Sequence, residues 1–199
     1  MNTLPTPKRF KGVEMSDKYG LHNGSDTSYE LGLSNPDYAL ALSLIVSRFV
    51  HLENEMAGVL SILLGLPELS PADYIMREIK SPRARLELME ALLEKAPLNR
   101  DRSEVWDKII SDFSGINTAR NDYVHGQWFT GASDKSVYLA KLRDDQHGMW
   151  YAVAKPIPLD DLNALVQSIW DLNQLVWHTV AEIRIAEREA AQAQQPSPP

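Results

Sequence analysis

The chain has 199 residues and a formal net charge of −7, with 44% hydrophobic residues and no cysteine. The hydrophobic fraction is sufficient for a packed core, so wholesale disorder is excluded, and the length suits one domain with tails. The absence of cysteine excludes disulfides, thiolate metal sites and cysteine nucleophiles. The acidic balance argues against a protein that coats nucleic acid through bulk charge, but it leaves room for a locally basic site.

Composition divides the chain into three segments. Residues 1–34 are rich in glycine and polar residues without a sustained hydrophobic period, and we expect a flexible N-terminal arm there. Residues 35–189 carry the hydrophobic periodicity and are expected to form one helical domain. Residues 190–199 are rich in alanine, glutamine and proline, which predicts a disordered tail.

Nothing in the sequence predicts export or membrane insertion. The opening MNTLPTPKRF lacks the apolar run of a signal peptide. The most apolar stretch, residues 38–64, contains a cluster of polar and charged side chains that a bilayer would not tolerate. We therefore expect no contact with a membrane and a cytoplasmic protein.

Helix signals dominate residues 35–189. Asn35 before Pro36 is a typical helix start, and Gly65 and Gly126 each follow an apolar, helically periodic segment that they are expected to end. Aromatic and β-branched residues flank a turn-like DDQHG, which predicts a β-hairpin. The expected elements are helices over 36–64, 70–79, 82–95 and 101–125, a hairpin of 137–143 with 149–154, and a last helix from residue 159.

The expected fold class is therefore mainly α, an antiparallel helical bundle with a small β-hairpin insertion before the last helix. The apolar face of that last helix is expected to include two tryptophans, Trp170 and Trp177, for which core packing is favoured over the stacking of bases.

Arg120 breaks the hydrophobic pattern of the helix expected over residues 101–125. At about 100° per residue, this arginine falls at the centre of the apolar stripe formed by residues such as Ile109, Phe113 and Ile116. One explanation is a structural arginine that snorkels or pairs with a buried carboxylate. The other is a stripe that faces a cleft or a partner subunit at this point, where the arginine binds an anion.

The residues that follow Arg120 add a second polar group. Asn121 and His125 are four positions apart, so they share one helical face and the amide can orient the imidazole. The side chain of Arg120 is long and the helix is expected to end at Gly126, so the guanidinium and the imidazole could reach one phosphate.

Residues 120–125, RNDYVH, resemble the motif of the HEPN superfamily, in which an arginine is followed after four to six residues by a histidine, often as R-N-x-x-x-H. The layout is also similar, with the motif at the end of a late helix in a helical bundle. The form RN-x-x-x-HG-x-W before a β-hairpin and a final helix resembles bacterial HEPN-like proteins. The resemblance covers residues 37–188 and leaves out the N-terminal arm.

The resemblance implies a HEPN-like bundle and a metal-independent endoribonuclease that needs no cofactor. Active HEPN proteins commonly form homodimers that bring two copies of the motif into one cleft. Carried onto this chain, His125 would serve as general acid or base, Arg120 would hold the scissile phosphate, and Asn121 would position the imidazole or bind the phosphate. Asp122 and Tyr123, within the motif, are expected to support the site.

The resemblance also suggests a setting, toxin–antitoxin or phage defence, with RNA as substrate and a protein antitoxin as a partner. Two alternatives remain open at this point. The chain could be a non-catalytic HEPN-like module for binding or dimerisation, in which Arg120 and His125 maintain an interface. It could also be a structural helical protein without either role.

Several other residues are further candidates for the site. Glu53, at the edge of the first stripe, is the best candidate for a carboxylate that faces Arg120, although a salt bridge without catalytic meaning is equally compatible. His51 and Glu55 are four positions apart, but two ligands do not make a metal site, so none is expected. The basic residues Lys80, Arg83 and Arg85 are candidates for binding phosphate, against the simpler interpretation of a solvated face.

Overall fold

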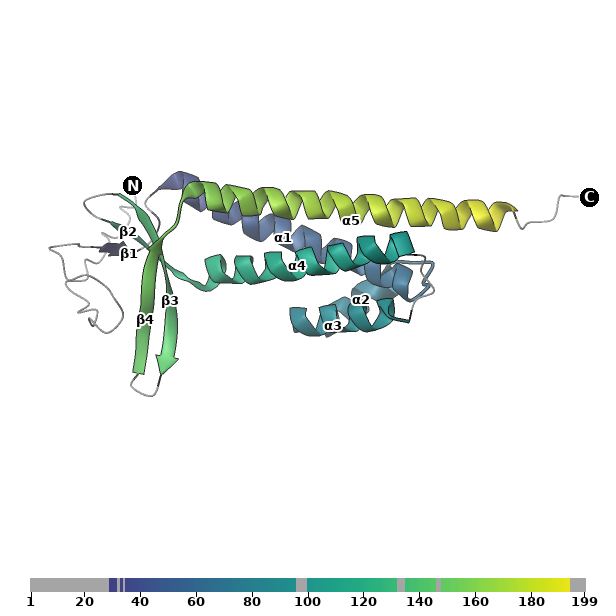
Figure 1. Ribbon diagram of the computed structural model, residues 1–199, viewed down its shortest axis with the longest axis horizontal. Coiled ribbons are helices and arrows are strands. Elements are labelled where there is room, and N and C mark those ends of the chain that lie inside the picture. The colour runs from purple at the N-terminus through teal and green to yellow at the C-terminus, as the bar shows by residue number, and fades with distance from the viewer. Residues whose placement is uncertain are drawn as a thin grey trace, which may run out of the picture. The chain divides into compact units, whose positions relative to one another are not determined.

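The computed structural model describes residues 29–31, 33, 35–95, 100–131, 135–145 and 148–193. This part of the chain is mainly helical, with five helices and a four-stranded antiparallel sheet (Figure 1). The predicted mainly α class and the predicted hairpin before the last helix are confirmed. Within the described ranges, no helix contains a stretch long and apolar enough to cross a bilayer.

The chain divides into two compact units. The first consists of residues 1–46 and 119–166, and the second of residues 47–118 and 167–199. Three helices contribute residues to both units: α1 (Pro36–Leu63), α4 (Arg100–His125) and α5 (Leu159–Ala193).

The first unit contains the sheet. Its strands follow the order of the chain, and each neighbouring pair is antiparallel. The predicted hairpin is formed by the last two strands, and two further strands extend it beyond the expectation from the sequence. The strands are β1 (Tyr29–Leu31), β2 (Gln127–Gly131), β3 (Val137–Asp145) and β4 (Gly148–Pro156).

The boundaries of the arm and the tail differ from the prediction. Residues 29–31 were expected in the flexible arm, but they pair with β2, because Tyr29 lies opposite Gly131 and Leu31 opposite Phe129. At the other end, α5 continues to Ala193, past the expected boundary at residue 189. The predictions for residues 1–28, for the hairpin turn at 146–147 and for 194–199 lie outside the described residues.

The start of α1 follows the local signals in the sequence. The side-chain oxygen of Asn35 accepts a hydrogen bond from the backbone N–H of Asp37 at 2.9 Å, so the predicted cap is confirmed. The hydroxyl of Tyr38 donates to the backbone oxygen of Ile157 at 2.8 Å. This bond ties the first turns of α1 to the segment that leads into α5.

The second unit holds α2 (Ser70–Glu78) and α3 (Pro82–Leu93) beside its parts of the three long helices. Ser81 caps α3, since its hydroxyl accepts from the N–H of Ala84 at 3.4 Å, as the Ser-Pro pair predicts. The rings of Phe49 and Phe113 meet at 5.4 Å in the core. Other fully buried side chains of this unit include Leu52, Met56, Leu60, Met89, Trp106, Ile109, Ile169 and Val176.

Within the second unit, α1 and α5 lie side by side and run parallel. The guanidinium of Arg48 lies over the ring of Trp170 at 5.1 Å, and Arg184 reaches the hydroxyl of Ser61 at 2.8 Å. Contacts therefore advance along both helices in the same direction. The sequence predicts antiparallel neighbours, and this pair is an exception.

Two tryptophans of α5 lie where the sequence did not predict them. Trp170 is 45% exposed and Trp177 is 54% exposed, so the expectation that both pack in the core is wrong. Each follows a buried residue of the apolar stripe, Ile169 and Val176 respectively, by one position. One position rotates a side chain by about 100° on a helix, which moves both indoles from the buried stripe to its edge.

Candidate functional site

The sequence motif occupies the last turns of α4 in the first unit. Arg120 and Asn121 are half-buried, as are Asp122 and Tyr123 between them and the end of the helix. His125 is the last residue of α4, and its side chain is exposed. The imidazole is therefore accessible to solvent and solutes, while the guanidinium that precedes it is partly enclosed.

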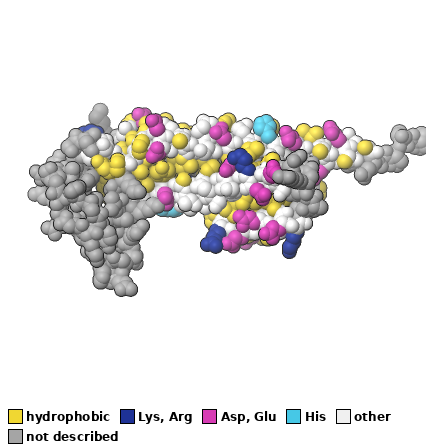
Figure 2. Space-filling model, in the orientation of Figure 1, with side chains coloured by type: hydrophobic (Ala, Val, Ile, Leu, Met, Phe, Trp, Pro, Cys, Tyr) yellow, Lys and Arg dark blue, Asp and Glu magenta, His cyan; other side chains and the backbone are white. Residues whose placement is uncertain are grey.

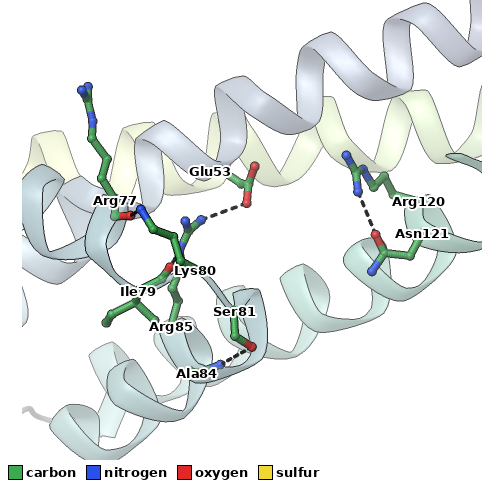
Figure 3. A network of polar contacts seen from close by, with 9 residues as sticks. All are labelled: Glu53, Arg77, Ile79, Lys80, Ser81, Ala84, Arg85, Arg120 and Asn121. Atoms are coloured by element: carbon green, nitrogen blue, oxygen red, sulfur yellow. Dashed lines mark hydrogen bonds and ion pairs between the residues drawn. The ribbon is translucent and has the colours of Figure 1, made fainter. Parts of the chain in front are cut away.

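Arg120 and Asn121 are joined directly. The Nη1 of Arg120 donates to the Oδ1 of Asn121 at 2.8 Å (Figure 3). Arg120 and Asn121 each make further interactions besides this bond. The bond restrains a long side chain at the position where the apolar stripe would call for a core residue. The geometry is compatible with both interpretations of Arg120, the structural arginine and the anion ligand.

An aromatic pair, formed by Tyr123 of the motif and Trp128 after it, holds the end of α4. The rings of Tyr123 and Trp128 stack with centroids 6.1 Å apart at an interplanar angle of 27°. The indole Nε1 of Trp128 donates to the backbone oxygen of Tyr123 at 2.9 Å. A carbonyl in the last turn of a helix has no partner within the helix, so this bond satisfies it. Trp128 was not predicted to be part of the site.

The surroundings of Tyr123 shift the pKa of its phenol. Burial raises the pKa of the Tyr123 phenol above its usual value of 10.0, and the carboxylates of Asp161 and Asp122 raise that pKa further. The phenol is therefore neutral at physiological pH. It can donate a hydrogen bond, but it cannot serve as a general base there.

Gly126 follows His125 and allows the sheet to approach the helix end closely. A Cβ at this position would overlap the Cδ1 of Leu139 on β3 and would lie 2.9 Å from the backbone oxygen of Asp122. Among the described glycines, only Gly65 has a positive φ. The prediction that a glycine follows the end of this helix is thus confirmed. Glycine is required here because a Cβ has no space, and not because the backbone is left-handed.

In the second unit, Glu53 pairs with an arginine of the basic cluster. The Oε1 of Glu53 accepts from the Nη1 of Arg85 at 3.0 Å, and the Nε of Arg85 donates to the backbone oxygen of Ile79 at 2.7 Å (Figure 3). Both charged side chains are largely buried, with exposures of 18% and 26% for Arg85 and Glu53. Glu53 and Arg120 belong to different units, so their pairing stays a prediction.

The remaining basic candidates contact nearby groups. Lys80 donates to the backbone oxygen of Arg77 at 2.8 Å, and Arg83 pairs with Glu87 at 2.7 Å on an exposed helix face. Exposed pairs of this kind are weak, so a phosphate could displace Glu87 from Arg83. Arg85 is different, because a phosphate would have to compete with the partly buried carboxylate of Glu53.

The structure thus joins Arg120 with Asn121 and leaves His125 exposed at the end of the same helix. The orientation of the His125 imidazole by Asn121 stays a prediction. The described residues contain no group of three or more histidine or acidic side chains arranged to hold a metal ion. Comparisons of the chain with protein-family models, curated proteins and solved structures give no match.

Proposed function

We propose that this chain is a HEPN-type, metal-independent endoribonuclease that acts as a homodimer, with Arg120, Asn121 and His125 as its catalytic residues. One observation carries the proposal: a restrained arginine–asparagine pair precedes an exposed histidine by about one helical turn, at the end of α4. These residues match the R-N-x-x-x-H pattern that the sequence shares with the HEPN superfamily.

The proposed reaction needs one group that moves protons and one that holds a phosphate. His125 takes the proton of a ribose 2′-hydroxyl, the 2′-oxygen attacks the adjacent phosphorus, and the 5′-oxygen leaves with a proton returned by an imidazole. The guanidinium of Arg120 binds the phosphate oxygens, where negative charge increases in the transition state. The products are a 2′,3′-cyclic phosphate and a 5′-hydroxyl, so the step consumes no water and no cofactor.

Asn121 has a positioning role in this scheme. Its amide oxygen accepts from the guanidinium at 2.8 Å, which limits the conformations of a side chain with many rotamers. A preset arginine loses less conformational entropy when the phosphate binds. The stacked Tyr123 and Trp128 hold the helix end that carries His125.

The test is cleavage of a single-stranded RNA in the presence of EDTA. Replacing His125 by alanine should reduce the rate by about 10²–10⁴-fold, because general acid–base catalysis contributes this much. Arg120→Lys should retain part of the activity and Arg120→Ala much less, because lysine keeps the charge without the fork. His178→Ala is the matched control, an exposed histidine in the second unit, and should cleave like wild type.

Equal activity in wild type and His125→Ala would reject the mechanism, and so would products that end in a 3′-hydroxyl. Thermal unfolding of each variant, followed by circular dichroism, separates loss of catalysis from loss of the fold.

The alternative is a non-catalytic HEPN-like module for binding or dimerisation, which the acidic surroundings of the motif favour. The carboxylates of Asp122 and Asp161 act on Tyr123 next to the proposed phosphate site, and the whole chain carries a charge of −7. Negative charge there opposes the approach of a polyanion. Under this alternative, wild type would bind a partner such as a protein antitoxin and cleave no RNA.

A further inference from the structure

A surface groove lies between α1 and α5 in the second unit, away from the motif in sequence. It has a volume of about 400 Å³, and its walls include Arg48, His51 and Glu55 from α1 and Trp170 and Trp177 from α5. Two indoles that are about half exposed are unusual on a soluble surface, where large apolar side chains rarely gather unless something covers them. Figure 2 shows hydrophobic side chains reaching one face of the molecule among acidic ones.

The charges and the tryptophans of this groove have the same spacing. Arg48 and Glu55 are seven positions apart on α1, and Trp170 and Trp177 are seven positions apart on α5. Seven residues are about two helical turns, so both members of each pair lie on one face of their helix. The centre of the groove therefore lies level with the midpoint of each pair, beside His51 on α1 and beside Asn173 and Gln174 on α5.

The two centres lie at the same level. Arg48 stacks on Trp170, and further along the same two helices Gly58 faces Val180, so the parallel helices keep one register. Glu55 is thus level with Trp177, and the midpoint between Arg48 and Glu55 is level with the midpoint between the tryptophans. A twofold axis that passes over both helices at this level, perpendicular to them, relates two copies of the chain. It places Arg48 of each copy at the level of Glu55 of the other, and Trp170 of each copy at the level of Trp177 of the other.

From this geometry we infer that the groove is the contact surface for a second copy of this chain. The axis lays α1 antiparallel on α1 of the partner subunit, with Arg48 opposite Glu55 of the partner subunit and Glu55 opposite the partner's Arg48. It also lays α5 on α5 of the partner subunit, with Trp170 opposite Trp177 of the partner subunit. Such an interface is self-complementary, which a twofold contact requires.

Charge and exposed aromatic area both favour a second copy of the chain at this groove. A chain of net charge −7 repels its own copies, so self-association is favoured where opposite charges meet. The Arg48 and Glu55 pair supplies two such contacts per dimer. The exposed faces of the indoles supply aromatic area, which is enriched in the centres of protein interfaces. The inference rests on the homodimer of the proposed function and names its contact surface, but it uses no residue of the motif, so it is tested without RNA cleavage.

The test uses charge reversal and sedimentation velocity on the full chain. Wild type should be a dimer at micromolar concentration. Arg48→Glu and Glu55→Arg, each alone, place like charges opposite each other twice, and each should weaken self-association at least tenfold. An equimolar mixture of the two single variants should recover a dimer, because both contacts of the mixed dimer then join opposite charges.

A matched pair of substitutions tests the tryptophans. Trp177 and Ile185 are each 54% exposed on α5, but only Trp177 lines the groove. Trp177→Ser should make the protein monomeric, whereas Ile185→Ser should leave it dimeric. Both substitutions are at exposed positions, so neither should prevent folding.

Three outcomes would overturn the inference. A wild-type chain that stays monomeric at high micromolar concentration would assign the groove to another occupant, such as a peptide or a nucleotide. Single charge variants that dimerise like wild type would exclude this register. A mixture of folded charge variants that stays monomeric would do the same.

Discussion

Two helices of this protein end at a glycine, and the two glycines do different things. Gly65 follows α1 with a φ of 63°, and open space surrounds the position of its missing Cβ. Gly126 follows α4 without a positive φ, and Leu139 and the backbone of Asp122 occupy the space that a Cβ would need. At Gly65 the backbone conformation requires a glycine, and at Gly126 the close packing requires one.

The end of α1 is a closed local motif. The N–H of Leu66 donates to the oxygen of Ser61 at 2.8 Å, and the N–H of Gly65 donates to the oxygen of Ile62 at 3.0 Å. These two bonds around a left-handed glycine form a Schellman cap. Arg184 of α5 then donates to the oxygen of Leu66 at 2.7 Å, within the same unit.

The end of α4 depends on partners farther along the chain. Trp128 donates to the carbonyl of Tyr123, and Leu139 of β3 packs against Gly126. This is the helix end that carries His125. A substitution at Gly126 therefore disturbs the contact between helix and sheet next to the motif, whereas one at Gly65 disturbs a helix cap that Arg184 of α5 contacts.

The largest effect is expected for Gly126→Ala. The new methyl group overlaps Leu139 and a backbone oxygen, so the substitution should lower the free energy of unfolding by about 3 kcal/mol, at the upper end for overpacking. Chemical denaturation measures this. In the background Leu139→Ala, the cost of Gly126→Ala should be clearly smaller, because one of the two obstacles is removed. Equal costs in both backgrounds would contradict the packing explanation.

A smaller effect is expected at the other glycine. Gly65→Ala forces an L-residue into the left-handed region and should cost about 1–2 kcal/mol of unfolding free energy. Gly115→Ala is the matched control, since Gly115 is exposed inside α4 and also has open space around its Cβ position. That substitution should instead stabilise by about 0.5–1 kcal/mol. Equal effects of the two in urea titrations would remove backbone conformation as the cause.

The smallest effect concerns the helix end beside His125. Trp128→Phe keeps an aromatic ring against Tyr123 but removes the donor to its carbonyl, and should cost about 1 kcal/mol. Trp128→Leu removes both contacts and should cost more. If thermal unfolding shows the same loss of stability for both variants, the ring stacking contributes nothing and the hydrogen bond alone stabilises the helix end.

Much of the helical structure was predictable from the sequence. The starts at Asn35 and Ser81 and the end at Gly65 follow from residues that act within four positions of themselves. The motif at residues 120–125 was also found at the sequence level, including its place at the end of α4. Its bond from Arg120 to Asn121 joins neighbours in the chain.

The features that the sequence did not predict depend on contacts between distant parts of the chain. Trp170 and Trp177 were expected in the core because their spacing fits the apolar stripe, but the hydrophobic period does not define the width of the buried face. The sequence did not predict the pairing of Glu53 with Arg85, which lies 32 positions away in the chain. Residues 29–31 carry no clear strand signal and become a strand by pairing with β2, nearly one hundred positions later.

The sequence by itself therefore determined where α1 and α3 begin and where α1 ends, because caps, prolines and glycines act through hydrogen bonds and sterics over a few residues. It also determined which residues form the candidate site, since these lie within one helical segment. Only the tertiary structure decided which long side chains are covered, which charges pair and why Gly126 must be glycine. Those outcomes depend on contacts between segments that are distant in the chain, and no local pattern encodes them.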